Sequence, residues 1–469
     1  LPAEQGKMGK FKEKIVVNYV LVAHNKMRNK SEKSEKVLQA RKTKVTWSAA
    51  QWQQYESRGV QLDQYAVFEN TDQTVAWYGF GAVATYTPSS PAAFTAVAAW
   101  VKQLRQQLAS TVSSQDIAIL GGFAFSTPGA TQHNGWGALA NGYFMLPRFL
   151  VKRSGGQTEL IELSEAAFAS ADLLADFEQF LPAIVQPGVK VDLLQQVEDA
   201  ASWQQAVQQV VTRLQTDAYL QKVVLARTLM VTAAQPFSAA QILLALRQVH
   251  TQVYHLVLKV ADQLFISATP ERLVAVQGQR LATAAVAGTT ARGVDAATDA
   301  ALGAALLKDQ KNRAEQQIVV TAIQQRLQNL TTELVLPARP QLLKSQQVQH
   351  LYTPITAKLQ PAADLFTAVA ALHPTPALGG QPAALALPLI QQLEPEYRGL
   401  FGAPFGYATL AGDGEFAVAI RSMLVQQQQA FLFAGAGIVA ASKPAAEVRE
   451  TTLKFQPMLQ LLRGVDHAK

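Results

Sequence analysis

The sequence predicts an α+β fold built largely from antiparallel sheets, and two observations lead to this expectation. β-Rich runs follow one another closely after residue 221, at 222–231, 254–260, 263–268, 272–276 and 280–286. Short turns, Ala261-Asp262 and Gln277-Gly278, join several of these runs into hairpins. Helical patterns are grouped between the hairpins instead of alternating with single strands. That grouping is typical of α+β proteins.

The remaining elements follow from the spacing of apolar residues. Helical spacing predicts helices at 91–110, 166–180, 203–220, 297–330 and 443–462. Alternating segments at 73–80 and 143–151 predict strands in the amino-terminal half, and two more strand pairs lie among loops rich in Gly and Pro beyond residue 330. No repeat of about 20–50 residues is visible.

Length and composition are those of a globular protein. A chain of 469 residues is long enough for two domains or for one large interleaved domain. Apolar residues make up 49% and charged residues 16%, which is far from the profile of a disordered chain. A sizeable core can therefore be buried.

The net charge of +7 is concentrated at the start of the chain. Residues 1–45 hold ten lysines and two arginines against four glutamates, a net +8, which leaves −1 for the rest. We expect residues 1–45 to form a basic, disordered tail. Sequence-independent nucleic-acid binding needs many Lys and Arg on one face, so the near-neutral body argues against nucleic acid as a partner.

The sequence also argues against a membrane protein. The longest apolar runs, 15–23 and 431–441, are much shorter than the roughly 18 residues of a membrane span. The first could pass for the core of a signal peptide, but Asn18 interrupts it and no clean cleavage site follows. The chain has no cysteine, which excludes disulfides, thiolate catalysis and Cys-ligated zinc and fits a cytoplasmic protein.

Two glutamates fall on apolar helix faces. Glu315 lies four residues before Val319, on a stripe continued by Ile323. Near the carboxyl end, Glu450 and Lys454 share helical spacing with buried-type residues. Carboxylates directed inward need a cation or a hydrogen-bond network, and Mg²⁺ is the natural candidate.

A simpler interpretation of these glutamates stays open. Glu315 can pair with Arg313 or Lys311 at the surface, and Glu450 can pair with Lys454, since such helical charge pairs are common.

A lysine and a glutamate at strand ends are candidate catalytic groups. Lys222 opens a β-branched strand, and Glu271 follows a strand end at Thr269-Pro270. Burial can lower the pKa of a lysine until it acts as a base and can raise that of a glutamate until it acts as an acid. Taken alone, such strand-end residues are more often solvated surface residues.

Nine motifs in this order resemble those of the chorismate-utilising enzymes, which include isochorismate, salicylate, anthranilate and aminodeoxychorismate synthases. The resemblance runs from about Trp47 to Leu462. The motifs are Lys222-Val-Val-Leu-Ala-Arg, Ala268-Thr-Pro-Glu-Arg-Leu, Ala287-Gly-Thr-Thr-Ala-Arg-Gly, Asp309-Gln-Lys-Asn-Arg-Ala-Glu, His350-Leu-Tyr-Thr, Leu372-His-Pro-Thr-Pro-Ala-Leu-Gly-Gly, Ala419-Ile-Arg-Ser, Gly435-Ala-Gly and Glu447-Val-Arg-Glu-Thr-Thr-Leu-Lys. Each is weak alone, but nine in family order are very specific.

The resemblance implies one large domain over 46–466, with an amino-terminal half at 46–202 and a catalytic half at 203–466. Two antiparallel sheets would pack together with helices outside and the active site in the cleft between them. The substrate would be chorismate, and the oligomeric state would be a monomer or a homodimer.

The resemblance also implies roles for individual residues. Glu315 and Glu450 would hold Mg²⁺, which reverses the simpler interpretation above. The residues that would bind or line the substrate are Arg421, Lys454, His350, Gly435, Gly437, Gly288 and Thr289.

Two positions indicate the nucleophile. Lys222 resembles the lysine that activates water in isochorismate and salicylate synthases, where anthranilate synthases usually carry glutamine. Ala287 stands where aminodeoxychorismate synthases often carry a nucleophilic lysine, and alanine cannot attack the substrate. We therefore expect an isochorismate synthase in which Lys222 takes a proton from water attacking C2 and Glu271 protonates the departing C4 hydroxyl.

The amino-terminal half and two departures refine this expectation. Residues 121–125 and 144–147 look like the corresponding half of menaquinone-type isochorismate synthases. Gln316 stands where the family usually has histidine, which puts a supporting contact in doubt, and Phe401 replaces a tyrosine implicated in the salicylate branch. The second departure favours a reaction that stops at isochorismate.

Three alternatives remain. The nearest is salicylate synthase, which forms isochorismate and then eliminates pyruvate. Anthranilate synthase would need an ammonia-delivering glutaminase partner, which we do not expect. A protein of a different class would bind nucleic acid or anionic lipid through the basic tail and carry an inactive enzyme body.

Overall fold

The computed structural model describes residues 37–88, 92–127, 132, 135–183, 192–344 and 348–463. In this part of the chain, hydrogen bonds join twenty strands into one antiparallel sheet. The strands are β1 (Gln39–Val45), β2 (Gln64–Glu69), β3 (Val75–Tyr86), β4 (Ala118–Phe123), β5 (Gly142–Ser154), β6 (Gln157–Ser164), β7 (Leu193–Glu198), β8 (Lys222–Ala233), β9 (Tyr254–Val260), β10 (Gln263–Thr269), β11 (Arg272–Gln277), β12 (Arg280–Ala291), β13 (Thr331–Val335), β14 (Gln341–Lys344), β15 (Val348–Leu359), β16 (Gly380–Gln381), β17 (Pro404–Thr409), β18 (Gly414–Val418), β19 (Ser422–Gln426) and β20 (Gln429–Ile438). The α-helices are α2 (Ala49–Gly59), α3 (Ala93–Gln107), α4 (Leu173–Phe180), α5 (Ala200–Thr216), α6 (Ala239–Val249), α7 (Ala296–Lys308), α8 (Gln310–Leu327), α9 (Leu365–Leu372), α10 (Ala383–Leu393) and α11 (Pro444–Arg463), with a short 3₁₀ helix at Gly137–Leu139.

The sheet has two arms that share strand β5. The first arm runs β1, β6, β5, β3, β2, β9, β10, β19, β20, β8 and β7. The second arm leaves β5 through β4 and continues through β17, β18, β11, β12 and β15, which also pairs with β13 and β14. The expected pair of antiparallel sheets is therefore confirmed, with the difference that the two are joined through β5.

The inner faces of the two arms pack against each other. The Phe68 ring of β2 lies 5.0 Å from the Tyr407 ring of β17, and the Phe265 ring of β10 lies 6.3 Å from that of Phe405. All but Tyr407 are fully buried members of one large apolar cluster, against which Tyr407 packs. The core thus lies between the arms.

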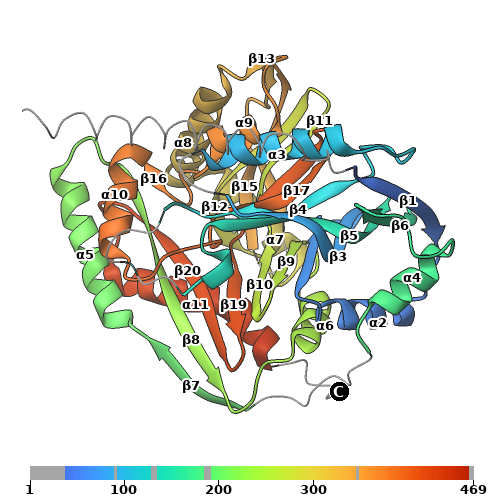
Figure 1. The fold of residues 1–469 in the computed structure, drawn as a ribbon. Coiled ribbons are helices and arrows are strands. Elements are labelled where there is room, and N and C mark those ends of the chain that lie inside the picture. Colours follow the sequence, from blue (N-terminus) through green and yellow to red (C-terminus); the bar gives the residue numbers. More distant parts are fainter. Residues whose placement is uncertain are drawn as a thin grey trace, which may run out of the picture.

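Helices cover the outer faces, as Figure 1 shows. Helices α2, α4, α6 and α11 share a second apolar cluster with the outer face of the first arm. Helices α5 and α10 share a third cluster with β8 and β20, and α8 packs on β12 and β15 in the second arm. The expected α+β arrangement with helices outside is confirmed.

Most predicted elements of the catalytic half are present, but the long helix expected at 297–330 is wrong. The chain leaves helical geometry at Asp309, where ψ is 119°, and this residue ends α7 and begins α8. Its carboxylate accepts a hydrogen bond from the Asn312 N–H at 2.7 Å, which is an N-cap for a new helix. The helix expected from 166 is also shorter, since it begins at Leu173 after the cap Asp172.

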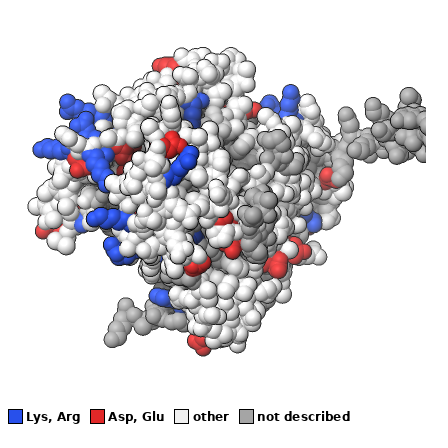
Figure 2. Space-filling view, turned by 90° about the vertical axis from the view of Figure 1, so that its left-hand side faces the viewer, with Lys and Arg blue, Asp and Glu red and all other residues white. Residues whose placement is uncertain are grey.

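The surface of the folded body carries both signs of charge. Figure 2 looks onto the side that carries α5 and α10 and shows Lys and Arg gathered at one edge, with Asp and Glu among them and a mostly neutral remainder. No helix of the described residues is long and apolar enough to cross a membrane.

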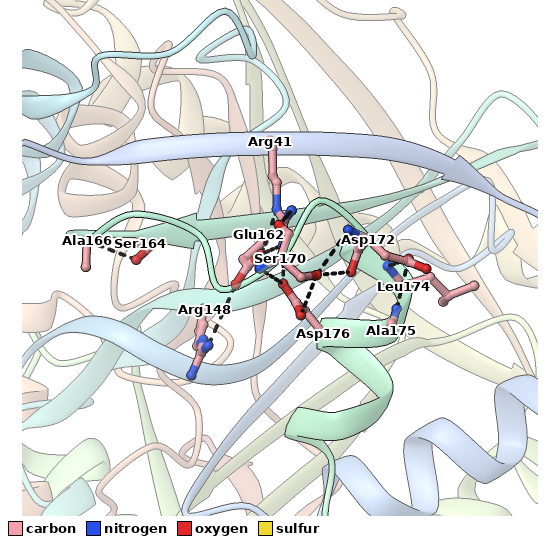
Figure 3. A network of polar contacts seen from close by, with 10 residues as sticks. All are labelled: Arg41, Arg148, Glu162, Ser164, Ala166, Ser170, Asp172, Leu174, Ala175 and Asp176. Atoms are coloured by element: carbon pink, nitrogen blue, oxygen red, sulfur yellow. Dashed lines mark hydrogen bonds and ion pairs between the residues drawn. The ribbon is translucent and has the colours of Figure 1, made fainter.

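The boundary of the expected basic tail is corrected by strand β1. Residues 39–45 pair with β6, with Arg41 opposite Glu162 in the register. The Arg41 guanidinium donates to the Glu162 carboxylate at 2.8 and 2.5 Å, to Asp176 at 2.5 Å and to the Ser170 carbonyl at 2.6 Å (Figure 3). This part of the lysine-rich segment is therefore part of the sheet, whereas residues 1–36 lie outside the described residues.

Candidate active site

Lys222 is the first residue of β8, and the structure leaves room for its side chain at a glycine of the next strand. The Lys222 Nζ lies 3.4 Å from Oε1 of Glu315 on α8, and the lysine side chain is 18% exposed. A Cβ built on Gly437 of β20 would lie 2.5 Å from the Lys222 Cε. Any residue larger than glycine at 437 would therefore move the ammonium group. Unlike most strand-end lysines, Lys222 is mostly buried and lies beside a carboxylate of α8.

Glu271 lies in the connection between β10 and β11, and burial has the largest effect on the pKa of its carboxyl group. Burial raises the pKa of the Glu271 carboxyl to about 7, against the opposing effect of the positive charges of Lys222 and Arg421. Its main-chain carbonyl accepts a hydrogen bond from the Val418 N–H at 2.9 Å. A glutamic acid held in this way is half protonated near neutral pH and can donate a proton.

Arg421 is fixed by its backbone. It has a φ of 48°, a conformation that non-glycine residues rarely adopt, and its carbonyl accepts a hydrogen bond from the Ala268 N–H at 3.0 Å. Burial lowers the pKa of the Arg421 guanidinium, while the charge of Glu271 acts in the opposite direction. The strained backbone places an arginine beside a buried acid, and strained backbone of this kind is common at functional sites.

His350 and Thr289 meet at a bulge between β12 and β15. The register shifts between Ala287 and Thr289, at Gly288, whose φ is 68°. The Thr289 Oγ1 lies 2.9 Å from the His350 Nδ1, and burial with the nearby charge of Arg421 lowers the pKa of His350. A Cβ on Gly288 would lie 2.9 Å from the Asn312 Oδ1, so the glycine lets the first turns of α8 approach the strand.

Glu450, Lys454 and Gly435 form a second group at α11 and β20. The Lys454 Nζ donates to Glu450 Oε1 at 2.7 Å and to the Gly435 carbonyl at 3.0 Å. The simpler pairing considered for Glu450 is thus present. The pairing considered for Glu315, with Arg313 or Lys311, is not found among the described residues, because Glu315 pairs with Lys222.

The expectation that the two carboxylates face the core is wrong. The side chain of Glu315 is 44% exposed and that of Glu450 is 52% exposed. The buried face of α8 is formed by Gln316, Val319, Val320, Ile323 and Leu327, so Glu315 lies at its border. Both carboxylates are accessible from solvent, as ligands of a cation that arrives with a substrate need to be.

A third carboxylate, Glu447, was not singled out from the sequence. It lies one turn before Glu450 on α11, and its pKa is raised by burial and by the negative charge of Glu450, against Lys454 and Lys311. Lys311 belongs to α8, so this interaction links the two groups of site residues. The signal was present as the i, i+3 spacing of the two glutamates within one motif.

These carboxylates are suited to hold Mg²⁺ together with water or substrate oxygens, and they do not form a complete metal site on their own. Among the described residues, no three His, Cys, Asp or Glu side chains come close enough together to hold a metal ion on their own. Mg²⁺ is commonly held by one or two carboxylates, with water or substrate oxygens completing its shell. The mutual repulsion that helps to raise the pKa of Glu447 is what a nearby cation would relieve.

The two family departures lie in supporting positions. The buried Gln316 amide donates to the Ala285 carbonyl at 3.0 Å and to Thr353 Oγ1 at 2.9 Å, so it ties α8 to β12 and β15. The Phe401 ring is buried and stacks on Phe433 at 5.5 Å.

A cavity of about 720 Å³ lies elsewhere, between α2 and α6, and none of the site residues above lines it. The site residues described here lie on β8, β12, β15, β20, α8 and α11 and in the connections next to β10 and β19.

Comparison with known proteins shows the family to which the sequence belongs. The sequence matches the family described as "Chorismate binding enzyme" over residues 22–463, so the match begins well before Trp47 and includes part of the segment expected to lie outside the family. The isochorismate synthase MenF of Bacillus subtilis is 34% identical over 360 residues, which cover 74% of each chain. The salicylate biosynthesis isochorismate synthase of Pseudomonas aeruginosa is 36% identical over 365 residues, again 74% of each chain.

A solved structure has the same fold over nearly the whole chain. The structure of MenF, the menaquinone-specific isochorismate synthase from Escherichia coli, superposes with a TM-score of 0.76 and 27% identity, and the match covers 94% of this chain and 98% of that one. With the family match and the relatives at more than 30% identity, the fold and the motif residues lead to one assignment. The chain belongs to the family of chorismate-binding enzymes.

Proposed function

We propose that this chain is an isochorismate synthase that converts chorismate to isochorismate in the cytoplasm, as a step toward menaquinone. The observation that carries the proposal is Glu271, a buried acid whose pKa is raised to about 7 beside Lys222 and Arg421. A proton donor and a proton acceptor close together are what exchange of a hydroxyl group requires. The names of the relatives support the same reaction.

The proposed reaction is a displacement with an allylic shift. Lys222 accepts a proton from a water molecule while the water oxygen bonds to C2 of the ring. The ring double bond moves, the C4–O bond breaks, and Glu271 gives its proton to the departing hydroxyl, which leaves as water. One water is consumed and one is released, so the overall change is an isomerisation.

Arg421 and Lys454 are the proposed partners of the substrate carboxylates. Arg421 lies near Glu271, and the Lys454 ammonium donates to the Gly435 carbonyl of β20. His350, Thr289, Gly288 and Gly437 would line the space between them. This division places positive charge at two separate points, as a dicarboxylate requires.

Glu315 and Glu450 are the proposed holders of Mg²⁺, with Glu447 close to Glu450. When bound, the ion would neutralise the ring carboxylate of the substrate and orient the ring. The lysines that now pair with these glutamates, Lys222 and Lys454, would be released toward substrate and water.

The proposal is tested by incubating the purified protein with chorismate and MgCl₂, with and without ammonium, and separating the products by chromatography. Isochorismate without salicylate, lost on addition of EDTA, is expected. Salicylate with pyruvate would assign the salicylate synthase reaction, and an ammonium-dependent product would assign anthranilate synthase chemistry. Absence of turnover with salt-sensitive nucleic-acid binding that is lost on deletion of residues 1–45 would favour the binding-protein alternative.

The magnesium ligands need a separate measurement. Glu450→Gln and Glu315→Gln are expected to raise the MgCl₂ concentration that gives half-maximal turnover by about tenfold or more. Glu333 is an exposed glutamate of β13, so Glu333→Gln is the matched control and should leave the half-maximal MgCl₂ concentration unchanged. An unchanged magnesium requirement in both site variants would remove these residues as ligands.

A further inference from the structure

Strand β8, which begins with Lys222, has a gap along one edge. On one side it pairs continuously with β20 from Val223 to Thr232. On the other side it pairs with β16 at Lys222 and Val223 and with β7 from Leu229 onward. Within the described residues, no strand occupies this edge between the two.

Two buried side chains fill part of the gap. The Ala226 N–H donates to Glu394 Oε1 at 2.7 Å, and Arg398 Nη2 donates to the Val224 carbonyl at 2.8 Å. Glu394 and Arg398 thereby supply the acceptor and the donor that a neighbouring strand would otherwise supply.

Glu394 and Arg398 form an ion pair that is itself enclosed. Both side chains are 3% exposed, and Arg398 Nε donates to Glu394 Oε2 at 2.8 Å, with a second bond from Nη2 to Oε1. The Arg398 guanidinium also lies 4.3 Å from the centroid of the Phe125 ring. A buried pair with this many fixed partners has one geometry available to it.

The same arginine holds the segment that pairs with Lys222. Arg398 Nη1 donates to the Leu378 carbonyl at 2.9 Å, two residues before β16. In β16, Gly380 pairs with Val223, and a Cβ on Gly380 would lie 2.3 Å from the Lys222 carbonyl. Arg398 therefore connects the backbone of β8 to the short strand that rests against Lys222.

We infer that the Glu394–Arg398 pair is a positioning pair that fixes the position of the Lys222 side chain. The inference rests on the proposed function of Lys222 as the base. Neither residue contacts Lys222 directly, so the pair acts through the backbone of β8 and β16. A shift of the lysine by about 1 Å is enough to lower turnover by about 100-fold without preventing substrate binding.

Arg398→Lys tests the inference, because lysine keeps the charge opposite Glu394 but cannot bond Glu394, Val224 and Leu378 together. We expect kcat to fall about 10- to 100-fold while KM for chorismate changes less than about threefold. Amide exchange of a peptide that covers 222–228 should become about tenfold faster or more, since the Ala226 N–H loses its fixed acceptor.

Glu56→Gln is the matched control. Glu56, a residue of α2, is also buried in an ion pair, with Arg247 of α6, but this pair lies at the outer face of the first arm. This variant should be destabilised and should keep wild-type kcat. If Arg398→Lys lowers kcat no more than Glu56→Gln does, the pair only stabilises the fold and the inference is overturned.

A double variant covers the case in which Arg398→Lys fails to fold. Glu394→Gln with Arg398→Met removes both buried charges, an exchange that buried pairs often tolerate. Methionine offers no donor to Val224 or Leu378, so the same fall in kcat is expected, and wild-type kcat would overturn the inference. If the wild-type protein makes no isochorismate, the proposed function has failed, and amide exchange at 222–228 still decides whether the pair fixes β8.

Discussion

The Lys222 ammonium lies 3.4 Å from the Glu315 carboxylate, although the two residues come from different arms of the sheet. Lys222 begins β8 of the first arm, and Glu315 lies on α8, which packs on the second. In the proposed reaction these groups separate, because Glu315 turns to Mg²⁺ and Lys222 to water. Their contact therefore defines the resting form of the site.

Lys222→Ala is expected to abolish turnover and to leave magnesium-dependent binding of chorismate intact, because the substrate carboxylates are assigned to other residues. Titration calorimetry with and without MgCl₂ measures the binding, and product chromatography measures the turnover. Lys358→Ala, an exposed lysine of β15, serves as the control. Wild-type turnover in Lys222→Ala would exclude this lysine as the base.

The pH dependence of turnover should report Glu271. Because its pKa is raised to about 7, the acid form is lost as pH rises through 7, and kcat should fall on that side of the profile. Glu271→Gln should lower kcat by about 10²- to 10⁴-fold. A profile that stays flat between pH 6 and 8 would argue against a proton donor at this position.

Unfolding measurements give a second view of Glu271 that does not depend on turnover. The folded chain holds this proton more tightly than the unfolded chain, because the pKa is raised from 4.5 to about 7. The stability that Glu271 contributes is therefore complete at low pH and is lost as pH rises through 7. Between about pH 4.5 and pH 7, the midpoint of unfolding of the wild type should therefore fall relative to that of Glu271→Gln.

Gly437→Ala should separate folding from activity. The added Cβ meets the end of the flexible Lys222 side chain at 2.5 Å, so the chain can still fold but the ammonium moves. We expect kcat to fall about 100-fold with a small change in the melting temperature. Gly278→Ala, in a turn where a Cβ meets nothing within 4 Å, places alanine at a φ of 58°, so it should cost some stability but keep wild-type kcat.

Arg41→Ala should destabilise the protein without affecting the site. Among the described residues, the substitution leaves the buried carboxylate of Glu162 with a single long ion-pair contact, from Arg148 at 3.7 Å, and breaking such a pair costs about 3–5 kcal/mol. Chemical unfolding measures the change in free energy, and turnover of the folded fraction should be unchanged. A loss below about 1 kcal/mol would mean that β1 contributes little.

The sequence predicted best those features that depend on neighbouring residues. The strands that begin at Lys222, Tyr254 and Gln263 start where expected, because apolar spacing and short turns specify hairpins locally. The break at Asp309 was missed because helical spacing continues through it, although an aspartate followed by Asn312 is a capping signal.

Features that depend on distant partners could not be predicted in the same way. Strand β1 was taken for a tail because its lysines suggested a solvated segment, whereas Arg41 finds Glu162 more than a hundred residues later. The exposure of Glu315 and Glu450 depends on how α8 and α11 pack against the sheet, which spacing alone does not determine. The family resemblance grouped the candidate site residues but specified neither the pairing of β1 nor this exposure.

The distribution of the site over both arms has a consequence for how activity arises. The proposed acid, base and metal ligands, from Lys222 to Glu450, lie on separate strands and helices, so no contiguous segment contains them. Because closing long loops costs chain entropy, contacts between such distant segments form slowly. In the proposed enzyme, turnover therefore requires both arms to be folded and packed together, so the onset of turnover during refolding should mark the end of assembly.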